Sequence, residues 1–460
     1  MKRFLAFCSV ALVVTVSPFA RAAEAPARVE GFTYVRTVGA ISEYTLESNG
    51  LSVLLMPDHS APVVTYQVTY RVGSRNEVTG TTGATHLLEH LMFKGSTNFN
   101  RENNKNVDQV LDPLGGSNNA TTWMDRTNYY EIFGNEHLPL VVEMEADRMR
   151  GLLLREEDRR PEMTVVRNEF ERGENSPFEA LEKEIFQAAF VAHPYHHSTI
   201  GWRSDIEKVS IEKLREFYDT FYWPNNATVS IVGDFQPAAA LGLLKKFYGV
   251  IPRSPKPIPE MYTEEPAQSG PRRVTVQRAG ELGVVAIAHK IPSATHPDAA
   301  PLTIASAILA SGKNSRLYKA LTDQSLSIGV QAAVYPTRDP GLHLTFVPLA
   351  PGVPHQKVEQ ITLDEIEKMK KSGVTETEVK SAIAKNIADS AFQKDGSFAI
   401  AAKLNENIAI GDWTTFYTFD EALKKVTAAD VQRVMQTYFD VDQSTTGYFI
   451  PRVPAPEAKP

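Results

Sequence analysis

The chain has 460 residues, of which 42% are hydrophobic and 22% are charged, a composition typical of a globular protein and not of a disordered one. This length exceeds one ordinary hydrophobic core, so we expect two domains. The formal charge of −7, without a basic stripe anywhere in the sequence, argues against nucleic acid as a partner.

The first 22 residues have the pattern of a secretory signal peptide. Lys2 and Arg3 form a positive start, residues 4–14 are mostly apolar, and Ala20-Arg21-Ala22 offers a cleavage site. The apolar run is short for a bilayer span, and no other window reaches ~18 apolar residues. We therefore expect an exported protein, periplasmic or secreted, with no membrane span after removal of the signal. A retained amphipathic anchor is the alternative.

Loss of this segment would change the chemistry that is open to the mature chain. It would remove the single cysteine, Cys8, and shift the formal charge from −7 to −10. A chain without a thiol forms no disulfide and has no thiol redox chemistry. A bound metal ion would then depend on nitrogen and oxygen ligands.

The sequence His86-Leu87-Leu88-Glu89-His90 places two histidines four residues apart, beside a glutamate. Residues i and i+4 of a helix lie on one face, so both imidazoles can reach one metal ion. The order H-x-x-E-H is the reverse of the zinc motif H-E-x-x-H. The Glu89 carboxylate need not bind the metal, because it can instead take a proton from metal-activated water. The alternative is a helix surface with two histidines and a solvated glutamate.

A third metal ligand is needed from elsewhere in the chain, because a catalytic zinc site usually has three protein ligands. Small and polar residues at 81–85 and Lys94-Gly95-Ser96 mark the two ends of a short helix around the motif. Residues 159–172 predict a second helix, which we expect to begin after its proline. Glu162 and Glu169 are seven residues apart on it and share a face. Either one could be the ligand, and the other could orient a histidine.

These motifs resemble the pitrilysin family of inverted zinc metallopeptidases, which includes mitochondrial processing peptidase and insulin-degrading enzyme. The resemblance covers nearly the whole mature chain. Further matching segments are Gly115 to Thr122, Thr127 to Tyr130, His193-Pro194-Tyr195, Trp223 to Asn226 and Val229 to Asp234. The resemblance implies one zinc ion per chain, with Glu89 as general base and with Glu162 as fallback ligand or as a carboxylate that orients a histidine. The ligands that it implies are His86, His90 and Glu169.

The family also implies a place for the substrate. In relatives, the stretch that matches Asn118, Asn119, Ala120 and Thr121 is a sheet edge near the zinc, where an extended peptide adds as a strand. Backbone hydrogen bonds hold such a peptide and leave selectivity to side-chain pockets. The alternative for these residues is a Gly-Asn turn that leads into an ordinary strand.

An internal repeat predicts two related halves. Residues 209–222 recur as residues 426–439, an offset of 217, and both copies place a Ser or Thr N-cap before a helix and then a strand. Between the halves, residues 251–272 carry six prolines and predict a stiff extended linker. We therefore expect an α+β fold of two homologous α/β-sandwich halves of the pitrilysin-like type, joined by this Pro-rich linker.

The predicted domain organisation follows from these features. The expected parts are a signal peptide (1–22), an N-terminal zinc-binding peptidase domain (23–250), the linker (251–272), a homologous C-terminal domain without the metal motif (273–450) and a flexible tail (451–460).

Histidines outside the motif are predicted not to be catalytic. Those of the second half are scattered without ligand spacing, and we expect them to be solvated or packed: His289, His296, His343 and His355. His193, His196 and His197 form a second-choice metal cluster, which we expect to shape a loop instead.

The second half also predicts a partner. Relatives complete the active site with an arginine and a tyrosine seven residues apart, after an S-R-L sequence in the zinc-free half. Here Ser315-Arg316-Leu317 is present, but Thr322 and Gly329 stand at those two positions. In the two-chain members of the family, the pair comes from a separate protein. The resemblance therefore implies a heterodimer with a homologous zinc-free subunit that supplies Arg and Tyr.

The function that the resemblance implies is that of a zinc metallo-endopeptidase subunit. It would hydrolyse peptides or short unfolded segments, with Glu89 as general base. The alternative is a non-catalytic scaffold or peptide-binding subunit of the same fold. The intact set of His86, Glu89, His90 and Glu169 favours the enzyme, because a scaffold has no physical need of all four.

Overall fold

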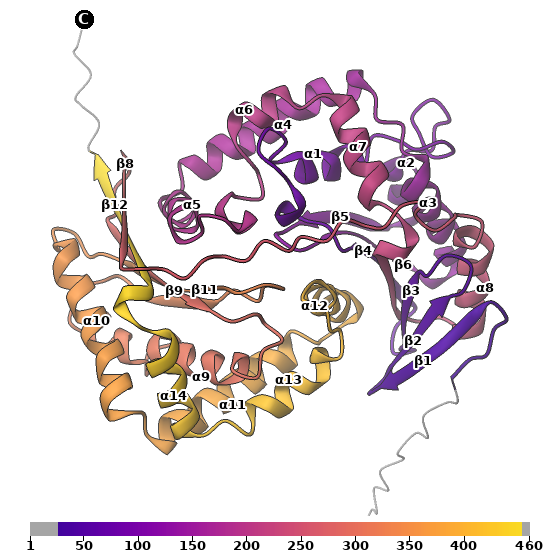
Figure 1. Cartoon of the computed structure of the whole chain (residues 1–460). Helices are drawn as coiled ribbons and strands as arrows, with labels where there is room; N and C mark the ends of the chain where they lie inside the picture. The colour runs from indigo at the N-terminus through magenta and orange to yellow at the C-terminus, as the bar shows by residue number, and fades with distance from the viewer. Residues whose placement is uncertain (1–25, 453–460) are drawn as a thin grey trace, which may run out of the picture.

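A computed structural model describes residues 26–452 as two α+β halves that face each other (Figure 1). The predicted signal peptide lies outside the described residues, as do residues 453–460 of the predicted tail. Pro451 and Arg452, which we assigned to that tail, belong instead to the last strand. Within residues 26–452, no helix is both long and apolar enough to cross a membrane.

The first half is built on a seven-stranded sheet in the order β1-β2-β3-β7-β4-β6-β5. The central strands β4 and β7 are buried along nearly their whole length, whereas β5 forms one edge and, among the strands of residues 26–452, pairs only with β6. The strands are β1 (Phe32–Val38), β2 (Ile41–Leu46), β3 (Ser52–Pro57), β4 (Val63–Tyr70), β5 (Ser117–Thr122), β6 (Thr127–Gly134) and β7 (Ala227–Gly233).

Helices of the first half cover one face of this sheet. Apolar side chains on α1, α3, α7 and α8 pack with those of the strands in one core, to which Leu87, Val141, Leu214 and Leu241 contribute. The helices are α1 (Ala84–Leu91), α2 (Val107–Leu111), α3 (Leu138–Gly151), α4 (Glu156–Glu174), α5 (Pro177–Ala189), α6 (Arg203–Lys208), α7 (Ile211–Phe221) and α8 (Pro237–Tyr248).

Helix α4 corrects one prediction, because it begins at Glu156 and contains Pro161 rather than beginning after it. A proline inside a helix loses its own hydrogen bond to the carbonyl four residues earlier. Three acidic residues, Glu156, Glu157 and Asp158, occupy the first turn, where the helix dipole favours negative charge. Val166 of this helix is buried in the core, so packing and the acidic first turn outweigh the lost bond.

The second half repeats this design with a smaller sheet, in the order β10-β11-β9-β12-β8. Its strands are β8 (Arg272–Ala279), β9 (Val284–Ile291), β10 (Gln331–Val334), β11 (Gly341–Pro348) and β12 (Ser444–Arg452). Its helices are α9 (Ala299–Ala310), α10 (His355–Ser372), α11 (Glu376–Phe392), α12 (Ser397–Ala409), α13 (Thr415–Leu423) and α14 (Ala428–Tyr438).

The two halves are related as the repeat predicted. Helix α14 begins 217 residues after α7, and β12 begins 217 residues after β7. Ser210 accepts a hydrogen bond from the Lys213 amide, and Thr427 accepts one from the Asp430 amide, so both act as N-caps. The strand order β3-β7-β4-β6-β5 corresponds to β8-β12-β9-β11-β10. The predicted fold class is confirmed.

Each half lends one helix to the sheet of the other. Helix α5 of the first half lies against the second sheet, where Leu181 and Ile185 pack with β8, β9, β11 and β12. Helix α12 of the second half lies against β4 and β7, where Ile400 and Leu404 pack with the first sheet (Figure 1). Gly447 of β12 permits the close approach of α5 to the second sheet, since a Cβ at this position would lie 2.8 Å from Leu181 Cδ1.

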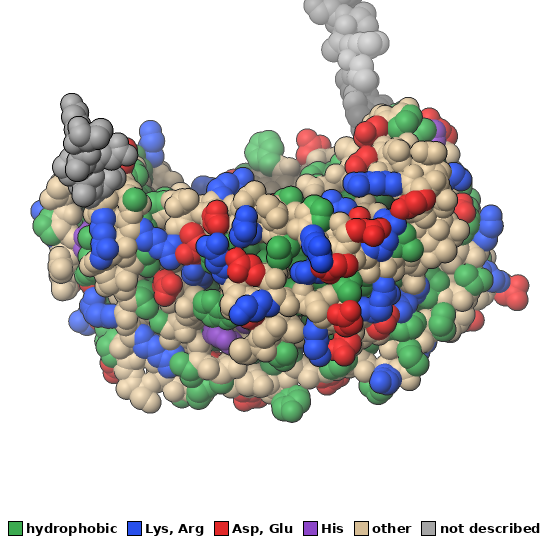
Figure 2. Space-filling model, turned by 90° about the horizontal axis from the view of Figure 1, so that it is seen from above, with side chains coloured by type: hydrophobic (Ala, Val, Ile, Leu, Met, Phe, Trp, Pro, Cys, Tyr) green, Lys and Arg blue, Asp and Glu red, His purple; other side chains and the backbone are tan. Residues whose placement is uncertain are grey.

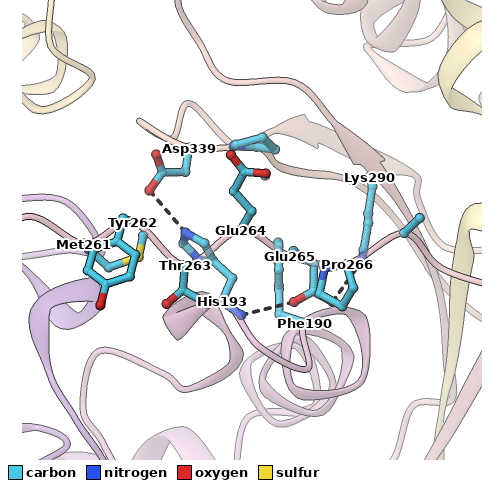
Figure 3. Close-up of a pocket in the computed structure, with 13 residues that line it drawn as sticks. Phe190, His193, Met261, Tyr262, Thr263, Glu264, Glu265, Pro266, Lys290 and Asp339 are labelled. Carbon is cyan, nitrogen blue, oxygen red and sulfur yellow. Dashed lines mark hydrogen bonds and ion pairs between the residues drawn. The ribbon is translucent and has the colours of Figure 1, made fainter.

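The segment 251–271 crosses between the halves without helix or strand. Glu265 fixes it, because its carboxylate accepts hydrogen bonds from the amides of Val191 and Ala192. The same carboxylate accepts a hydrogen bond from the His193 amide and pairs with Lys290 of β9 (Figure 3). A cavity of about 500 Å³ lies between this segment, the loop after α5 and the second sheet. The linker is thus extended, and it is tied to both halves.

Candidate metal centre

Helix α1 is held at both its start and its buried face. Gly83 caps it with φ +81°, and a Cβ there would lie 2.3 Å from the carbonyl oxygen of Ile200. The buried carboxylate of Glu77 accepts hydrogen bonds from the Gly83 amide at 2.9 Å and the Thr85 amide at 2.8 Å. Leu87, Leu88 and Leu91 anchor the helix in the core. The motif therefore lies on a fixed helix.

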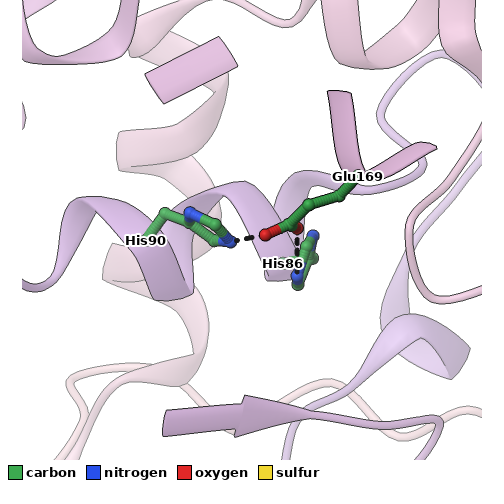
Figure 4. Close-up of side chains that lie close together, drawn as sticks. All are labelled: His86, His90 and Glu169. Atoms are coloured by element: carbon green, nitrogen blue, oxygen red, sulfur yellow. Dashed lines mark ion pairs between the residues drawn. The ribbon is translucent and has the colours of Figure 1, made fainter. Parts of the chain in front are cut away.

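Glu169 of α4 meets both histidines of α1 (Figure 4). Its Oε2 lies 3.7 Å from His86 Nε2 and 3.6 Å from His90 Nε2. In residues 26–452, these three form the single group of three or more potential metal ligands whose atoms lie within 4.8 Å of one another. Ligand atoms of a tetrahedral zinc ion lie roughly 3.4 Å apart at the usual bond lengths. The donor set therefore fits zinc in both type and spacing.

Glu162 lies on the other side of the His90 ring. Its Oε1 is 2.9 Å from His90 Nδ1, and its Oε2 is 2.5 Å from Lys94 Nζ. Burial raises the pKa of Glu162, but the hydrogen bonds from His90 and Lys94 outweigh burial and leave this pKa lowered. The carboxylate thus fixes the ring and leaves Nε2 free to face Glu169, the arrangement usual for a histidine that binds metal.

The pKa values of the two histidines are shifted in opposite directions. Burial and the neighbouring His90 lower the pKa of His86 to about 3, so His86 is neutral near pH 7, as metal binding requires. Burial also lowers the pKa of His90, but the hydrogen bond to Glu162 and the carboxylates of Glu89 and Glu169 outweigh it and leave this pKa raised. A cation at the centre would replace the proton that these carboxylates favour.

Glu89 is buried beside the three converging atoms. Thr122 of β5 donates a hydrogen bond of 2.5 Å to its Oε2. Burial raises the pKa of Glu89, although Thr122 and the positive charges of His90 and Arg126 oppose this shift. A carboxylate with a raised pKa next to a metal site is suited to accept and release a proton.

A cavity of about 520 Å³ joins these groups to the edge strand. Its lining is made of His86, Glu89, His90, Phe93, Lys94, Asn119, Ala120, Thr121, Thr122, Glu162 and Glu169.

Strand β5 places its side chains on alternate faces. Ala120 is buried and Thr122 reaches Glu89, whereas Asn119 and Thr121 are exposed on the opposite face. Asn118, on the Ala120 face, is half-buried. Among the described residues β5 has no strand on its outer side. Its outward backbone groups are therefore open to an added strand.

Other histidines are not brought together as ligands. His193 accepts a hydrogen bond from the Tyr195 amide at Nδ1 and donates one from Nε2 to the Asp339 carboxylate at 3.1 Å, and His197 is buried near Glu77. Neither joins His196 in a ligand group within the described residues. In the second half, His289 and His343 are opposite each other on β9 and β11 and pack on Phe439. These two are packing histidines, as predicted.

Thr322 and Gly329, which stand where relatives have Arg and Tyr, lie near the end of a π-helical turn and in the loop after it. Thr322 ends a turn of π-helix, and its hydroxyl lies 2.8 Å from the Ser327 hydroxyl. Gly329 follows in the loop before β10. Arg316 forms an ion pair with Glu378 at 2.8 Å.

Three residues of the site were missed in the sequence. Lys94 was interpreted only as a helix end, Thr122 only as part of a matching segment, and Arg126 not at all. Strand alternation offered a signal for Thr122, since the residue after Thr121 faces the opposite side of the sheet. No local sequence pattern predicts a role for Arg126 or for Lys94. The partner of Arg126 is Glu406 and that of Lys94 is Glu162, and both partners are distant in sequence.

The comparisons with known proteins agree with this geometry. The family model for "Insulinase (Peptidase family M16)" matches residues 52–202, and that for "Peptidase M16 inactive domain" matches residues 208–386. The zinc protease PqqE of Helicobacter pylori is 31% identical over 413 residues, which are 88% of this chain and 91% of the relative.

Solved structures share the fold. The crystal structure of a protease from Helicobacter pylori has a TM-score of 0.84 and 30% identity, and it covers 91% of this chain and 99% of its own. The periplasmic protease PqqL from Escherichia coli has a TM-score of 0.75 and 16% identity, over 91% of this chain and 48% of its own. With the metal motif in the first half and an equivalent second half, the chain belongs to peptidase family M16, the insulinase or pitrilysin family of zinc metallopeptidases.

Proposed function

We propose that this protein is the zinc-bearing subunit of an endopeptidase for peptides or short unfolded segments. The observation that carries the proposal is the convergence of His86 Nε2, His90 Nε2 and Glu169 Oε2 beside a buried Glu89 and an open strand edge. These residues would hold one zinc ion. A zinc ion there would lower the pKa of water toward ~7 and polarise a peptide carbonyl.

Side chains of this protein would transfer the proton and hold the reacting groups in position. The Glu89 carboxylate accepts a proton from water and delivers it to the departing amine of the cleaved peptide bond. Thr122 holds Glu89 Oε2 in place. Glu162 orients the His90 ring through Nδ1, and Lys94 in turn holds Glu162. These contacts are formed before substrate binds, which reduces the reorganisation that catalysis requires.

The substrate would bind as a strand along β5. Asn118, Asn119, Ala120 and Thr121 offer an edge that pairs with β6 on one side only. A peptide there would make backbone hydrogen bonds and pass the metal ligands, since the same cavity contains both. Binding through the backbone explains selection for extended or unfolded segments, because folded proteins rarely expose such a strand.

A partner subunit would complete the site. Thr322 and Gly329 stand where relatives have Arg and Tyr, and Thr322 is engaged with Ser327. The PqqL chain is about twice the length that this chain covers, and this chain also matches the structure of the first half of PqqL alone. We propose a heterodimer with a homologous zinc-free subunit that supplies the two donors to the substrate backbone and the developing oxyanion.

Two further expectations complete the proposal. The pattern in residues 1–22 supports export to the periplasm or secretion. On the face of the molecule that Figure 2 shows, basic and acidic side chains are interspersed and not gathered by sign, which supports the expectation that nucleic acid is not a partner. A non-catalytic scaffold or peptide-binding subunit is the second candidate, and the missing Arg and Tyr are the observation that favours it.

The test is zinc-dependent cleavage of a mixed fluorogenic peptide pool, with Glu89→Gln as background. Glu89→Gln should keep zinc and lose about 10²- to 10⁴-fold in rate, because only the proton acceptor is lost. Cleavage by the wild-type chain alone, above that background, would confirm the peptidase and contradict the need for a partner. No cleavage alone, followed by cleavage on addition of a homologous zinc-free subunit, would support both proposals. Equal rates for wild type and Glu89→Gln would contradict the role of Glu89.

A further inference from the structure

The turn between β5 and β6, residues 123–126, belongs to the first half but packs against the second half. Trp123 stacks on Tyr335 with ring centroids 6.5 Å apart and an interplanar angle of 15°. Met124 is buried in the core cluster that α5 forms with the second sheet. The candidate substrate strand is thus continuous with a turn that rests on the zinc-free half.

Asp125 fixes this turn from one side. It is buried, and its carboxylate accepts hydrogen bonds from the Arg338 amide at 3.0 Å and from the Tyr195 hydroxyl at 2.8 Å. Arg75 Nη1 lies 3.3 Å from Asp125 and 3.1 Å from Asp339. A buried carboxylate with this many partners is costly to move, because each lost partner leaves an uncompensated charge.

Arg126 fixes the turn from the other side. Its guanidinium lies 2.6 Å from Glu406 Oε1 of α12 and donates to the carbonyl oxygen of Thr121 at 3.0 Å and to the Thr121 hydroxyl at 2.5 Å. The Asn405 side-chain amide donates to the same Glu406 oxygen at 3.2 Å. Arg126 therefore joins a helix of the second half directly to the edge strand.

The side chains of the last two residues of β5, Thr121 and Thr122, point to opposite faces of the first sheet and contact different groups. Thr121 is held by Arg126 on one face of the sheet, and Thr122 holds Glu89 on the other. The chain of contacts Glu406–Arg126–Thr121 therefore ends one residue from the side chain that touches the general base. A shift of α12 relative to the first sheet would move both the strand and Thr122.

We propose that the zinc-free second half positions the substrate strand and Glu89 through the Arg126–Glu406 contact. Arg126 and Glu406 are positioning residues, since neither touches the metal ligands. This inference rests on the proposed peptidase function, and it gives the second half a role within its own chain. The Arg126 side chain is 10% exposed and that of Glu406 is 36% exposed, so water screens the pair only in part.

The experiment compares Glu406→Gln with Glu421→Gln, a matched control on α13 whose carboxylate pairs with Lys424 at the surface. For the peptide pool, with the partner if it is required, Glu406→Gln should lower kcat/KM about tenfold, mainly through KM. Zinc content and thermal stability should stay near wild type, and Glu421→Gln should have no effect. The conservative variant Glu406→Asp keeps a carboxylate for Arg126 and should recover part of the loss.

Hydrogen exchange of residues 117–122 tests the contact without any need for activity. Faster exchange there in Glu406→Gln, with unchanged exchange in α1, supports the proposal even if no substrate is cleaved. Unchanged exchange and unchanged KM would overturn it, as would a loss of activity that follows a loss of zinc. Failure of the peptidase proposal is seen separately, as equal cleavage by wild type and Glu89→Gln.

Discussion

The two halves place the same elements in the same order, yet within residues 26–452 only the first half carries the candidate metal centre. Helix α1 follows β4, and α9 follows β9, in corresponding positions of the two sheets. Helix α1 presents two histidines and a glutamate on one side, whereas α9 is buried on nearly all sides and carries no histidine. The fold therefore does not require the chemistry, which depends on a few side chains placed on one copy of it.

The helices that face α1 and α9 differ in the same way. Helix α4 brings Glu169 to α1, whereas the corresponding helix α11 packs on α9 through Val379 and Ala382. Glu378 of α11 pairs with Arg316, so the charge on this helix serves structure. The edge strands differ too, because β5 has six residues and β10 has four. The second half also has a cavity between α9, β10 and α11, lined by Thr303, Ser306 and Asn386 among others, but in the described part of the chain only the cavity of the first half holds three potential metal ligands.

The largest effect is expected from removal of a metal ligand. His90→Ala should reduce zinc from one ion per chain to none, because one of three ligands and the contact to Glu162 are both lost. His296→Ala in the second half is the matched control, and its zinc content should equal that of wild type. Elemental analysis after dialysis against a chelator measures both. Full zinc retention in His90→Ala would remove His90 from the ligand set.

Substitution of the two glutamates of α4, Glu162 and Glu169, should weaken zinc binding to different extents. Glu169→Gln should weaken zinc binding more strongly than Glu162→Gln, for which a loss of roughly 10- to 100-fold is expected of a residue that orients a ligand. Competition with a chromophoric chelator measures both affinities. The opposite order would mean that Glu162 is the ligand, the alternative that the sequence alone left open.

The second half should be sensitive to acid through its buried histidine pair. Burial, with the neighbouring His343 and Lys370, lowers the pKa of His289 to about 3, and burial lowers that of His343 to about 3. Both histidines are therefore neutral when folded but gain protons near pH 6.5 when unfolded. Their contribution to stability is present above this pH and is lost as pH falls from about 6.5 toward 3.

Urea unfolding between pH 4.5 and 7.5 measures this dependence. His343→Gln should flatten the pH dependence of the free energy of unfolding by up to about 1.4 kcal/mol per pH unit. His296→Gln, at an exposed site of the same half, should not flatten it. An equal slope in wild type and His343→Gln would contradict the assignment.

The smallest effect is expected where the halves exchange helices. Gly447→Ala would place a Cβ 2.8 Å from Leu181 Cδ1 and 3.0 Å from Ile185 Cδ1, so the side chains of α5 must shift. We expect a loss of about 1 kcal/mol in the free energy of unfolding. Gly329→Ala is the control, because nothing lies within 4 Å of a Cβ at that position. Equal stability of the two variants would show that α5 is loosely packed on β12.

The sequence by itself determined the family, the two related halves and the placement of the metal motif on a helix. These depend on the spacing of His86 and His90 and on the N-caps Ser210 and Thr427, which are local signals, and on the recurrence of one capped-helix pattern after 217 residues. Such signals are visible because helix periodicity and capping involve residues within a few positions of one another. The prediction that α4 begins after Pro161 was wrong because it used this local signal alone, whereas packing allows the helix to begin at Glu156.

Only the tertiary structure decided which glutamate faces the two histidines, which residue holds Glu89, and how each half supports the other. Glu162 and Glu169 share a helix face, and only the position of α4 over α1 separates their contacts. The Arg126–Glu406 pair joins residues that are 280 positions apart. The physical reason is that these contacts depend on how the two sheets and their exchanged helices pack, which no short window of sequence specifies.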